Sequence, residues 1–135
     1  MKPPSVTKRT SVPKVGKRAD LGGLRFRSAW EANYARYLNL LVTQGRIASW
    51  EYEGKTFTFE KISRGNRTYM PDFKVTLLDG AHEWHEVKGY MDPASRTKLT
   101  RMARYFPGET IKIIDRSWFQ QAKRSGLAGA IVGWE

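Results

Sequence analysis

The sequence predicts an α/β domain, with a mixed central sheet of about four to five strands and helices on its faces. Three stretches carry this prediction. Two alternating runs flank the Asp79-Gly80 dipeptide, and apolar residues recur at helical spacing over residues 28–43. A second helical stretch separates this hairpin from an alternating run at 110–114. A strand that returns through a helix is typical of parallel pairing.

Residues 1–20 are expected to form a flexible basic arm ahead of a single domain over residues 21–135. Residues 1–18 contain three prolines, no acid and six of the lysines and arginines that produce the net charge of +11. Such a segment can neutralise DNA phosphates, although a solubilising tail has the same composition. The six basic residues are Lys2, Lys8, Arg9, Lys14, Lys17 and Arg18.

A helix is expected from Ser28 to about Thr43. Ser28 and Glu31 have the spacing of a capping box, and Gly45 is placed to end the helix in a left-handed conformation. Glu31 therefore has two interpretations: it caps the helix by accepting the Ser28 N–H, or it points into an active site as a metal ligand. The apolar face of the helix consists of Trp30, Tyr34, Tyr37, Leu38 and Leu41.

Two strands are expected at residues 47–53 and 55–62, on either side of Gly54. Their aromatic residues suit a half-buried sheet. The loop over residues 63–67 carries Arg64 and Arg67, which are candidates for contact with phosphate.

The next hairpin carries the candidate chemistry. Pro71 begins the first strand, where its missing N–H costs least, and Asp72 follows it. In the second strand Glu86 and Lys88 lie on one face, so hairpin pairing gathers both with Asp72. Two carboxylates offer the hard oxygen ligands that Mg²⁺ prefers, and a lysine beside them can orient water or balance phosphate charge. The alternative is a surface hairpin with an ordinary Glu-Lys pair.

After the hairpin, Asp92 and Pro93 predict the start of a helix that runs to about Tyr105. Its basic residues either follow a DNA backbone or form a solvated face; they are Arg96, Lys98, Arg101 and Arg104. A strand at 110–114 and a helix at 117–125 follow. Residues 127–135 are apolar and cover either the core or a partner.

The two histidines, His82 and His85, are expected at the periphery, with His85 the more exposed. They lie two residues apart on opposite strand faces, which is poor geometry for binding one metal ion.

The composition favours a folded protein with a polyanionic partner. Hydrophobic residues make up 40% of the 135 residues, which argues against general disorder. The net charge of +11 favours nucleic acid over an anionic membrane. No apolar run or secretory leader stands out, and the absence of cysteine fits a reducing, cytoplasmic setting.

The chain resembles the PD-(D/E)xK nuclease superfamily. Pro71-Asp72 matches the first half of its signature and Glu86-Val87-Lys88 the second half. Over about residues 25–115 the order of elements is similar to that of the phage endonuclease I type of junction-resolving enzyme, including the helix opened by residues 27–31 and the Trp50-Glu51-Tyr52-Glu53 strand. A looser similarity links it to small phage nucleases.

The resemblance implies a restriction-endonuclease-like core and a Mg²⁺-dependent endodeoxyribonuclease, with Mn²⁺ as a substitute ion. Asp72, Glu86 and the Val87 carbonyl would hold the ion, and Glu31 could bind a second one. Lys88 would activate water. Cleavage would leave a 5′-phosphate and a 3′-hydroxyl. A homodimer acting on branched recombination intermediates is expected, in the host cytoplasm if the protein is phage-encoded. The residues expected to bind DNA are Lys8, Arg9, Lys14, Lys17, Arg18, Arg27, Arg64, Arg67, Arg96, Lys98 and Arg101.

Two other functions stay open at the level of sequence. One is a DNA-binding module that keeps the fold without catalysis, and the other is a nuclease subunit that cuts only beside partner proteins. Only the clustered carboxylates distinguish the enzyme from the binding module, since a phosphate-binding surface has no use for groups that repel DNA.

Overall fold

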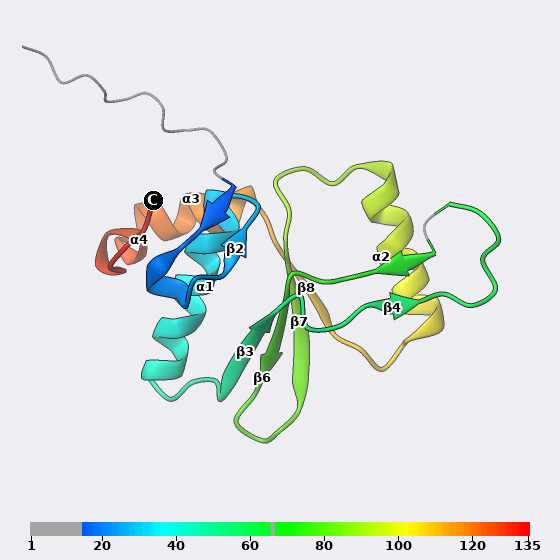
Figure 1. Cartoon of the computed structure of the whole chain (residues 1–135), viewed down its shortest axis with the longest axis horizontal. Helices are drawn as coiled ribbons and strands as arrows, with labels where there is room; N and C mark the ends of the chain where they lie inside the picture. The colour runs from blue at the N-terminus through cyan, green and yellow to red at the C-terminus, as the bar shows by residue number, and fades with distance from the viewer. Residues whose placement is uncertain (1–14, 66) are drawn as a thin grey trace, which may run out of the picture.

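The structure is a computed structural model, and it describes residues 15–65 and 67–135 (Figure 1). Its elements follow one another in the order β1 (Gly16–Lys17), η1 (Ala19–Leu21), β2 (Arg25–Phe26), α1 (Ala29–Thr43), β3 (Ser49–Tyr52), β4 (Phe57–Thr58), β5 (Thr68–Tyr69), β6 (Phe73–Thr76), β7 (His82–Val87), α2 (Pro93–Tyr105), β8 (Ile111–Ile114), α3 (Arg116–Arg124) and α4 (Leu127–Ala130).

The central sheet has four strands in the order β3-β6-β7-β8. β6 pairs antiparallel with both β3 and β7, whereas β8 lies parallel to β7 and is reached through α2. The predicted α/β class, with a mixed sheet flanked by helices, is confirmed. The predicted parallel strand at 110–114 is confirmed as well, because an intervening helix lets the chain return in the same direction.

The β6–β7 hairpin differs from the prediction in its turn. The Leu77 N–H donates to the Ala81 carbonyl at 2.7 Å, so the loop holds three residues, 78–80, rather than two. Gly80 takes the left-handed conformation with φ of 90°, and the Asp79 carboxylate accepts the Ala81 N–H at 2.9 Å. A three-residue loop closed by a left-handed glycine is a common alternative to the two-residue turn.

Two hydrophobic clusters lie on opposite faces of the sheet. Phe73, Val75 and Val87 face α1 and α3, and with them they form the larger cluster. Trp84 points to the other face, where it packs with Met102 of α2 and with aromatic residues of β4 and β5. Figure 1 accordingly shows α1, α3 and α4 on one side of the strands and α2 with β4 on the other. The alternation of strand side chains produces this division.

α1 begins and ends as predicted. The Ser28 hydroxyl accepts the Glu31 N–H at 3.1 Å, and Gly45 follows the helix with φ of 71°. α2 is likewise capped by Asp92, with Pro93 in its first turn. α3 starts one residue before the expected helix, because the Asp115 carboxylate caps it by accepting the Trp118 N–H.

The segment predicted as a strand at 55–62 is mostly irregular. Its only strand is β4, which pairs with β5 and not with the central sheet. β5 itself was not predicted. The aromatic residues of this segment, Phe57 and Phe59, are buried against α2 rather than against α1, so the segment leaves the central sheet to cover Trp84.

The predicted boundary of the basic arm is wrong for residues 15–20. β1 pairs with β2, and Arg18 forms a 2.6 Å ion pair with Glu135. The C-terminal residues cover the core: Trp134 packs beside Trp118, and Glu135 also pairs with Arg36. The rest of the arm, residues 1–14, lies outside the described residues. Among the described helices, none has the length and apolar character needed to cross a membrane.

Candidate active site

The hairpin brings Asp72, Glu86 and Lys88 to one end of the central sheet. Asp72 immediately precedes β6, Glu86 lies in β7 and Lys88 follows β7. Phe73 pairs with His85, which places Asp72 next to Glu86; the Asp72 N–H donates to Glu86 Oε1 at 3.3 Å. Lys88 Nζ lies 3.8 Å from Glu86 Oε2. The convergence expected from the strand pattern is present.

Asp72 is held rigidly and is almost entirely buried, with 2% of its surface exposed. Its Oδ2 accepts the Val87 N–H at 2.8 Å, and its Oδ1 accepts a hydrogen bond from Arg27 at 3.0 Å. Burial raises the pKa of Asp72 to about 8, with further contributions from the negative charges of Glu86 and Glu31. The two hydrogen bonds do not compensate fully for the loss of water.

Glu86 is the second carboxylate of the pair. Its Oε1 accepts a hydrogen bond from the Tyr69 hydroxyl at 3.1 Å. Burial raises the pKa of Glu86, while Lys88 and the Tyr69 hydrogen bond oppose the rise. Burial also raises the pKa of Tyr69, and the neighbouring Glu86 adds to this effect, so the phenol remains a donor.

Arg27 supplies a positive charge inside the site. Besides Asp72, its guanidinium forms an ion pair with Glu53 and lies 3.7 Å from Glu31 Oε2. Glu53 has φ of 54°, a conformation that is uncommon outside glycine, and its N–H donates to the Asp72 carbonyl. Burial alone would lower the pKa of Arg27, but the surrounding carboxylates raise it overall. Arg27 is therefore part of the site rather than a free contact for DNA.

Glu31 points toward the site but has partners of its own. Its Oε1 accepts hydrogen bonds from the Tyr52 hydroxyl at 2.6 Å and from the Arg27 N–H at 3.2 Å. The expected bond to the Ser28 N–H is replaced by this bond to the preceding residue. Within residues 15–65 and 67–135, no three His, Cys, Asp or Glu side chains form a group suited to a metal ion, so Glu31 does not complete a three-carboxylate site.

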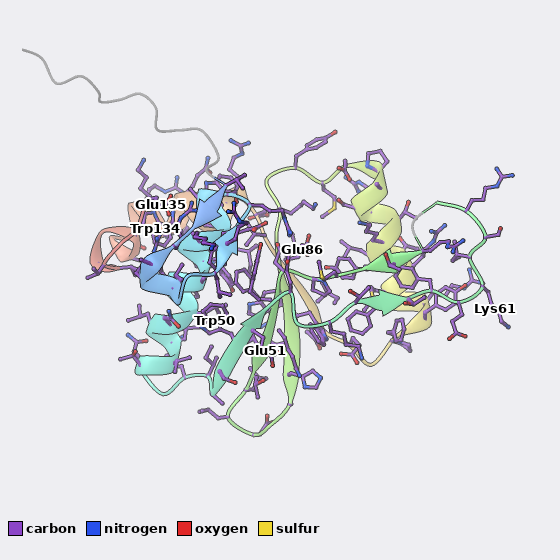
Figure 2. The ribbon with its side chains drawn as sticks, in the orientation of Figure 1. Trp50, Glu51, Lys61, Glu86, Trp134 and Glu135 are labelled. Atoms are coloured by element: carbon purple, nitrogen blue, oxygen red, sulfur yellow. The ribbon has the colours of Figure 1, made fainter. Side chains whose placement is uncertain are left out.

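A cavity of about 330 Å³ opens above Asp72 and Glu86. It lies between the end of the central sheet and the part of the molecule formed by β5 and α2, where Figure 2 labels Glu86. Polar and charged side chains line much of it. The residues in its wall are Arg27, Thr68, Tyr69, Met70, Asp72, Glu86, Lys88, Met91, Ser95, Lys98, Leu99 and Ile113.

The donor set fits a hard divalent cation. Both carboxylates lie in the cavity wall, and both have raised pKa values because burial removes them from water and repulsion from neighbouring carboxylates adds to the rise. A bound cation would remove that repulsion and restore both groups to the ionised state. Oxygen ligands and room for water are typical of a Mg²⁺ site.

A protein-family model matches residues 14–123, which include every side chain of the site described above. The chain belongs to this family. Its description is "Protein of unknown function (DUF1064)". No curated protein matches the chain, and no solved structure matches it.

The DUF1064 match also covers most of the residues predicted to bind DNA, which the structure places in different surroundings. Lys98 lines the cavity, whereas Arg96 and Arg101 line a second hollow beside Ile62. Arg64, Arg67 and Lys17 are exposed, and Arg18 is paired with Glu135. The remaining three, Lys8, Arg9 and Lys14, lie outside the described residues.

The prediction that His85 is exposed is wrong. His85 is buried within the DUF1064 region, where its ring bonds the Tyr34 hydroxyl at 2.7 Å and Glu83 at 2.8 Å. Burial lowers its pKa, so the ring is held neutral. The prediction failed because both faces of β7 are covered by other elements. A polar residue in an alternating strand pattern does not show that its face is covered. Tyr69 was also missed as a site residue, since its position depends on β5.

Proposed function

We propose that this DUF1064 chain is a Mg²⁺-dependent endodeoxyribonuclease that hydrolyses phosphodiester bonds. The observation that carries the proposal is the pair of adjacent carboxylates, buried Asp72 and partly buried Glu86, in one cavity wall with Lys88 beside them. Burying two acids close together is costly, and the cost is useful where a cation must be bound. The net charge of +11 supports a polyanionic substrate.

Asp72 and Glu86 would hold the ion, and the surrounding contacts fix their orientation. The Val87 N–H anchors one oxygen of Asp72, and the Tyr69 hydroxyl anchors one oxygen of Glu86. When bound, Mg²⁺ acts as a Lewis acid on phosphate and lowers the pKa of a coordinated water.

Lys88 would act on the reacting phosphate and water. Its ammonium group borders the cavity, where it can donate hydrogen bonds to the attacking water and balance the charge that develops on the phosphate. Arg27 keeps Asp72 in place and adds a second positive charge at the cavity wall.

The finer parts of the proposal rest on the resemblance to the PD-(D/E)xK superfamily. They are the restriction-endonuclease-like core, branched DNA as the substrate, a 5′-phosphate product, a homodimer and a cytoplasmic location. A second metal ion at Glu31 is left out of the proposal, because the described residues contain no group of three His, Cys, Asp or Glu side chains suited to a metal ion. A non-catalytic DNA-binding module explains the charge but gives no reason for two adjacent carboxylates in the cavity wall that repel DNA.

The test uses purified protein with labelled linear duplex and four-way DNA, in Mg²⁺ or in EDTA. Cleavage is expected in Mg²⁺ only, and faster on the four-way substrate. Replacing Asp72 or Glu86 by Ala is expected to lower the rate by about a thousandfold or more, and Lys88→Ala by about a hundredfold. Glu51→Ala is the matched control, because Glu51 is an exposed carboxylate on β3. Equal rates for wild type, Asp72→Ala and Glu86→Ala would refute the site, and cleavage that appears only with added partners would indicate a dependent subunit.

A further inference from the structure

The charge of the described chain is concentrated in one part of the molecule. We define the basic lobe as residues 55–65, 67–69 and 93–108, which form β4, β5, the loop between them and α2 with its C-terminal turn. The basic lobe contains eight lysines and arginines and a single acid, Glu60, for a net charge of +7. The rest of the described chain has twelve basic and twelve acidic residues, so its net charge is zero.

The basic lobe is built to present these charges outward. Its apolar side chains, including Phe57, Phe59 and Met102, are buried against Trp84 of the sheet. Figure 1 shows α2 and β4 on the side of the strands away from α1, α3 and α4, and Figure 2 shows Lys61 at the outer end of the loop. Arg101 apart, no lysine or arginine of the basic lobe takes part in a salt bridge with the residues that the structure describes.

The basic lobe also borders the candidate active site. Tyr69 of β5 and Lys98 of α2 line the cavity together with Asp72 and Glu86, and the Tyr69 hydroxyl donates to Glu86. A second hollow of about 370 Å³ lies along α2 between Ile62 and its arginines. α2 is about 20 Å long, and duplex DNA carries one negative charge per about 1.7 Å of its axis. A DNA backbone that lies along α2 therefore places several of its phosphates beside this helix before it reaches the cavity.

We propose that the basic lobe is the docking surface for the phosphate backbone of DNA, and that it guides the backbone into the cavity. The inference deepens the proposed function and rests on it only for the choice of DNA. An anionic membrane is the less suitable partner, because a membrane-surface helix needs exposed apolar side chains beside its charges. The large exposed hydrophobic residues of the described chain all lie outside the basic lobe.

The experiment compares two variants that each remove four charges. The lobe variant combines Lys61→Gln, Arg64→Gln, Arg96→Gln and Arg104→Gln. The control variant combines Arg25→Gln, Arg46→Gln, Lys123→Gln and Arg124→Gln, all of them exposed and outside the basic lobe. Affinity for a labelled duplex is measured in EDTA over a range of salt concentrations, with thermal melting as the check on folding.

We expect the lobe variant to bind DNA at least about tenfold more weakly at moderate salt, with the slope of log affinity against log salt reduced by about 3 to 4. The control variant is expected to lose less than about threefold. Equal losses in both variants would overturn the proposal, because net charge alone would then explain binding. So would wild-type protein that binds phosphatidylserine vesicles but not DNA. If the fourfold lobe variant does not fold, Lys61→Gln with Arg64→Gln is compared with Lys123→Gln and Arg124→Gln, and half of the slope change is expected.

Cleavage, scored separately in Mg²⁺, distinguishes the two proposals. Wild-type cleavage together with unchanged binding by the lobe variant would refute the docking surface and leave the nuclease proposal standing. If the wild-type protein binds DNA through the basic lobe but does not cleave it, the nuclease proposal is refuted and the docking surface stands.

Discussion

At the scale of single residues, the site is a balance of charges that favours an added cation. Asp72 is buried beside the partly buried Glu86, and only part of their charge is offset by Arg27 and Lys88. Raised pKa values mean that the folded protein binds protons more tightly than the unfolded chain. Without a metal ion, the contribution of these two carboxyls to stability is therefore complete below the ordinary carboxyl pKa, and it is lost as pH rises through about 8, the pKa of Asp72.

Glu86→Gln tests this balance. The variant removes the charge of Glu86, which adds to the rise that burial produces in the pKa of Asp72, while its amide oxygen can still accept from Tyr69. In EDTA we expect the variant to melt at or above the wild-type temperature near pH 8, with a weaker loss of stability between about pH 5 and pH 8. Thermal melting against pH checks this. When the melting experiment is repeated with Mn²⁺, we expect the ion to stabilise the wild-type protein and not the variant. Equal stabilisation of the variant would contradict the assignment of Glu86 as a metal ligand.

Arg27→Gln tests the resident positive charge. Its loss leaves the carboxylates of Asp72, Glu31 and Glu53 without a shared partner. We expect stability in EDTA to fall by about 1–2 kcal/mol, less than for a fully buried ion pair because the Arg27 side chain is half exposed. Mn²⁺ should recover more stability in this variant than in wild type. Arg25→Gln, which changes an exposed arginine of β2 two residues earlier, is the control, and equal gains in both variants would count against the charge balance.

At the scale of elements, the first turn of α1 positions half of the site. The Ser28 cap fixes the helix start. The Arg27 N–H donates to Glu31, and the Arg27 side chain lines the cavity. The hairpin positions the other half through the pairing of β6 with β7. The site therefore depends on how these two elements meet.

Ser28→Ala is expected to reduce stability by about 1 kcal/mol, because the Glu31 N–H loses its acceptor. Asp115→Ala is a matched control: it removes the cap of α3 at a similar cost, and Asp115 is not among the residues that line the cavity. Cleavage should fall severalfold in Ser28→Ala and stay unchanged in Asp115→Ala when both are assayed below their melting temperatures. A similar rate for the two variants would mean that α1 does not position the site.

At the scale of the whole molecule, charge is divided between the basic lobe and the N-terminal residues. Residues 1–14 carry four lysines and arginines and no acid, and they stay predicted as a phosphate-binding arm. Deleting them should reduce the salt slope of DNA affinity by up to about 3 to 4 without moving the cleavage position, because phosphate contacts carry no direct sequence information. A salt titration of both proteins in EDTA checks this. Equal slopes would show that these residues do not neutralise phosphates.

Local periodicity in the sequence was enough to predict part of the fold. The alternation around Asp79-Gly80, the Ser28 cap and the Asp92-Pro93 start specified a hairpin and two helices, since these signals act over a few residues. They also indicated that Asp72, Glu86 and Lys88 would meet, because a strand pattern with fixed register leaves little freedom.

Which distant groups complete the site, and how the charge is distributed, depends on packing between elements that are far apart in the sequence. Arg27 and Tyr69 reach Asp72 and Glu86 from other elements, and β7 is covered on both faces so that His85 is buried. The aromatic segment after Gly54 leaves the central sheet because it packs, together with α2, over Trp84. Long-range packing of this kind is set by the fit of surfaces that meet across the fold, and no local pattern of residues encodes it.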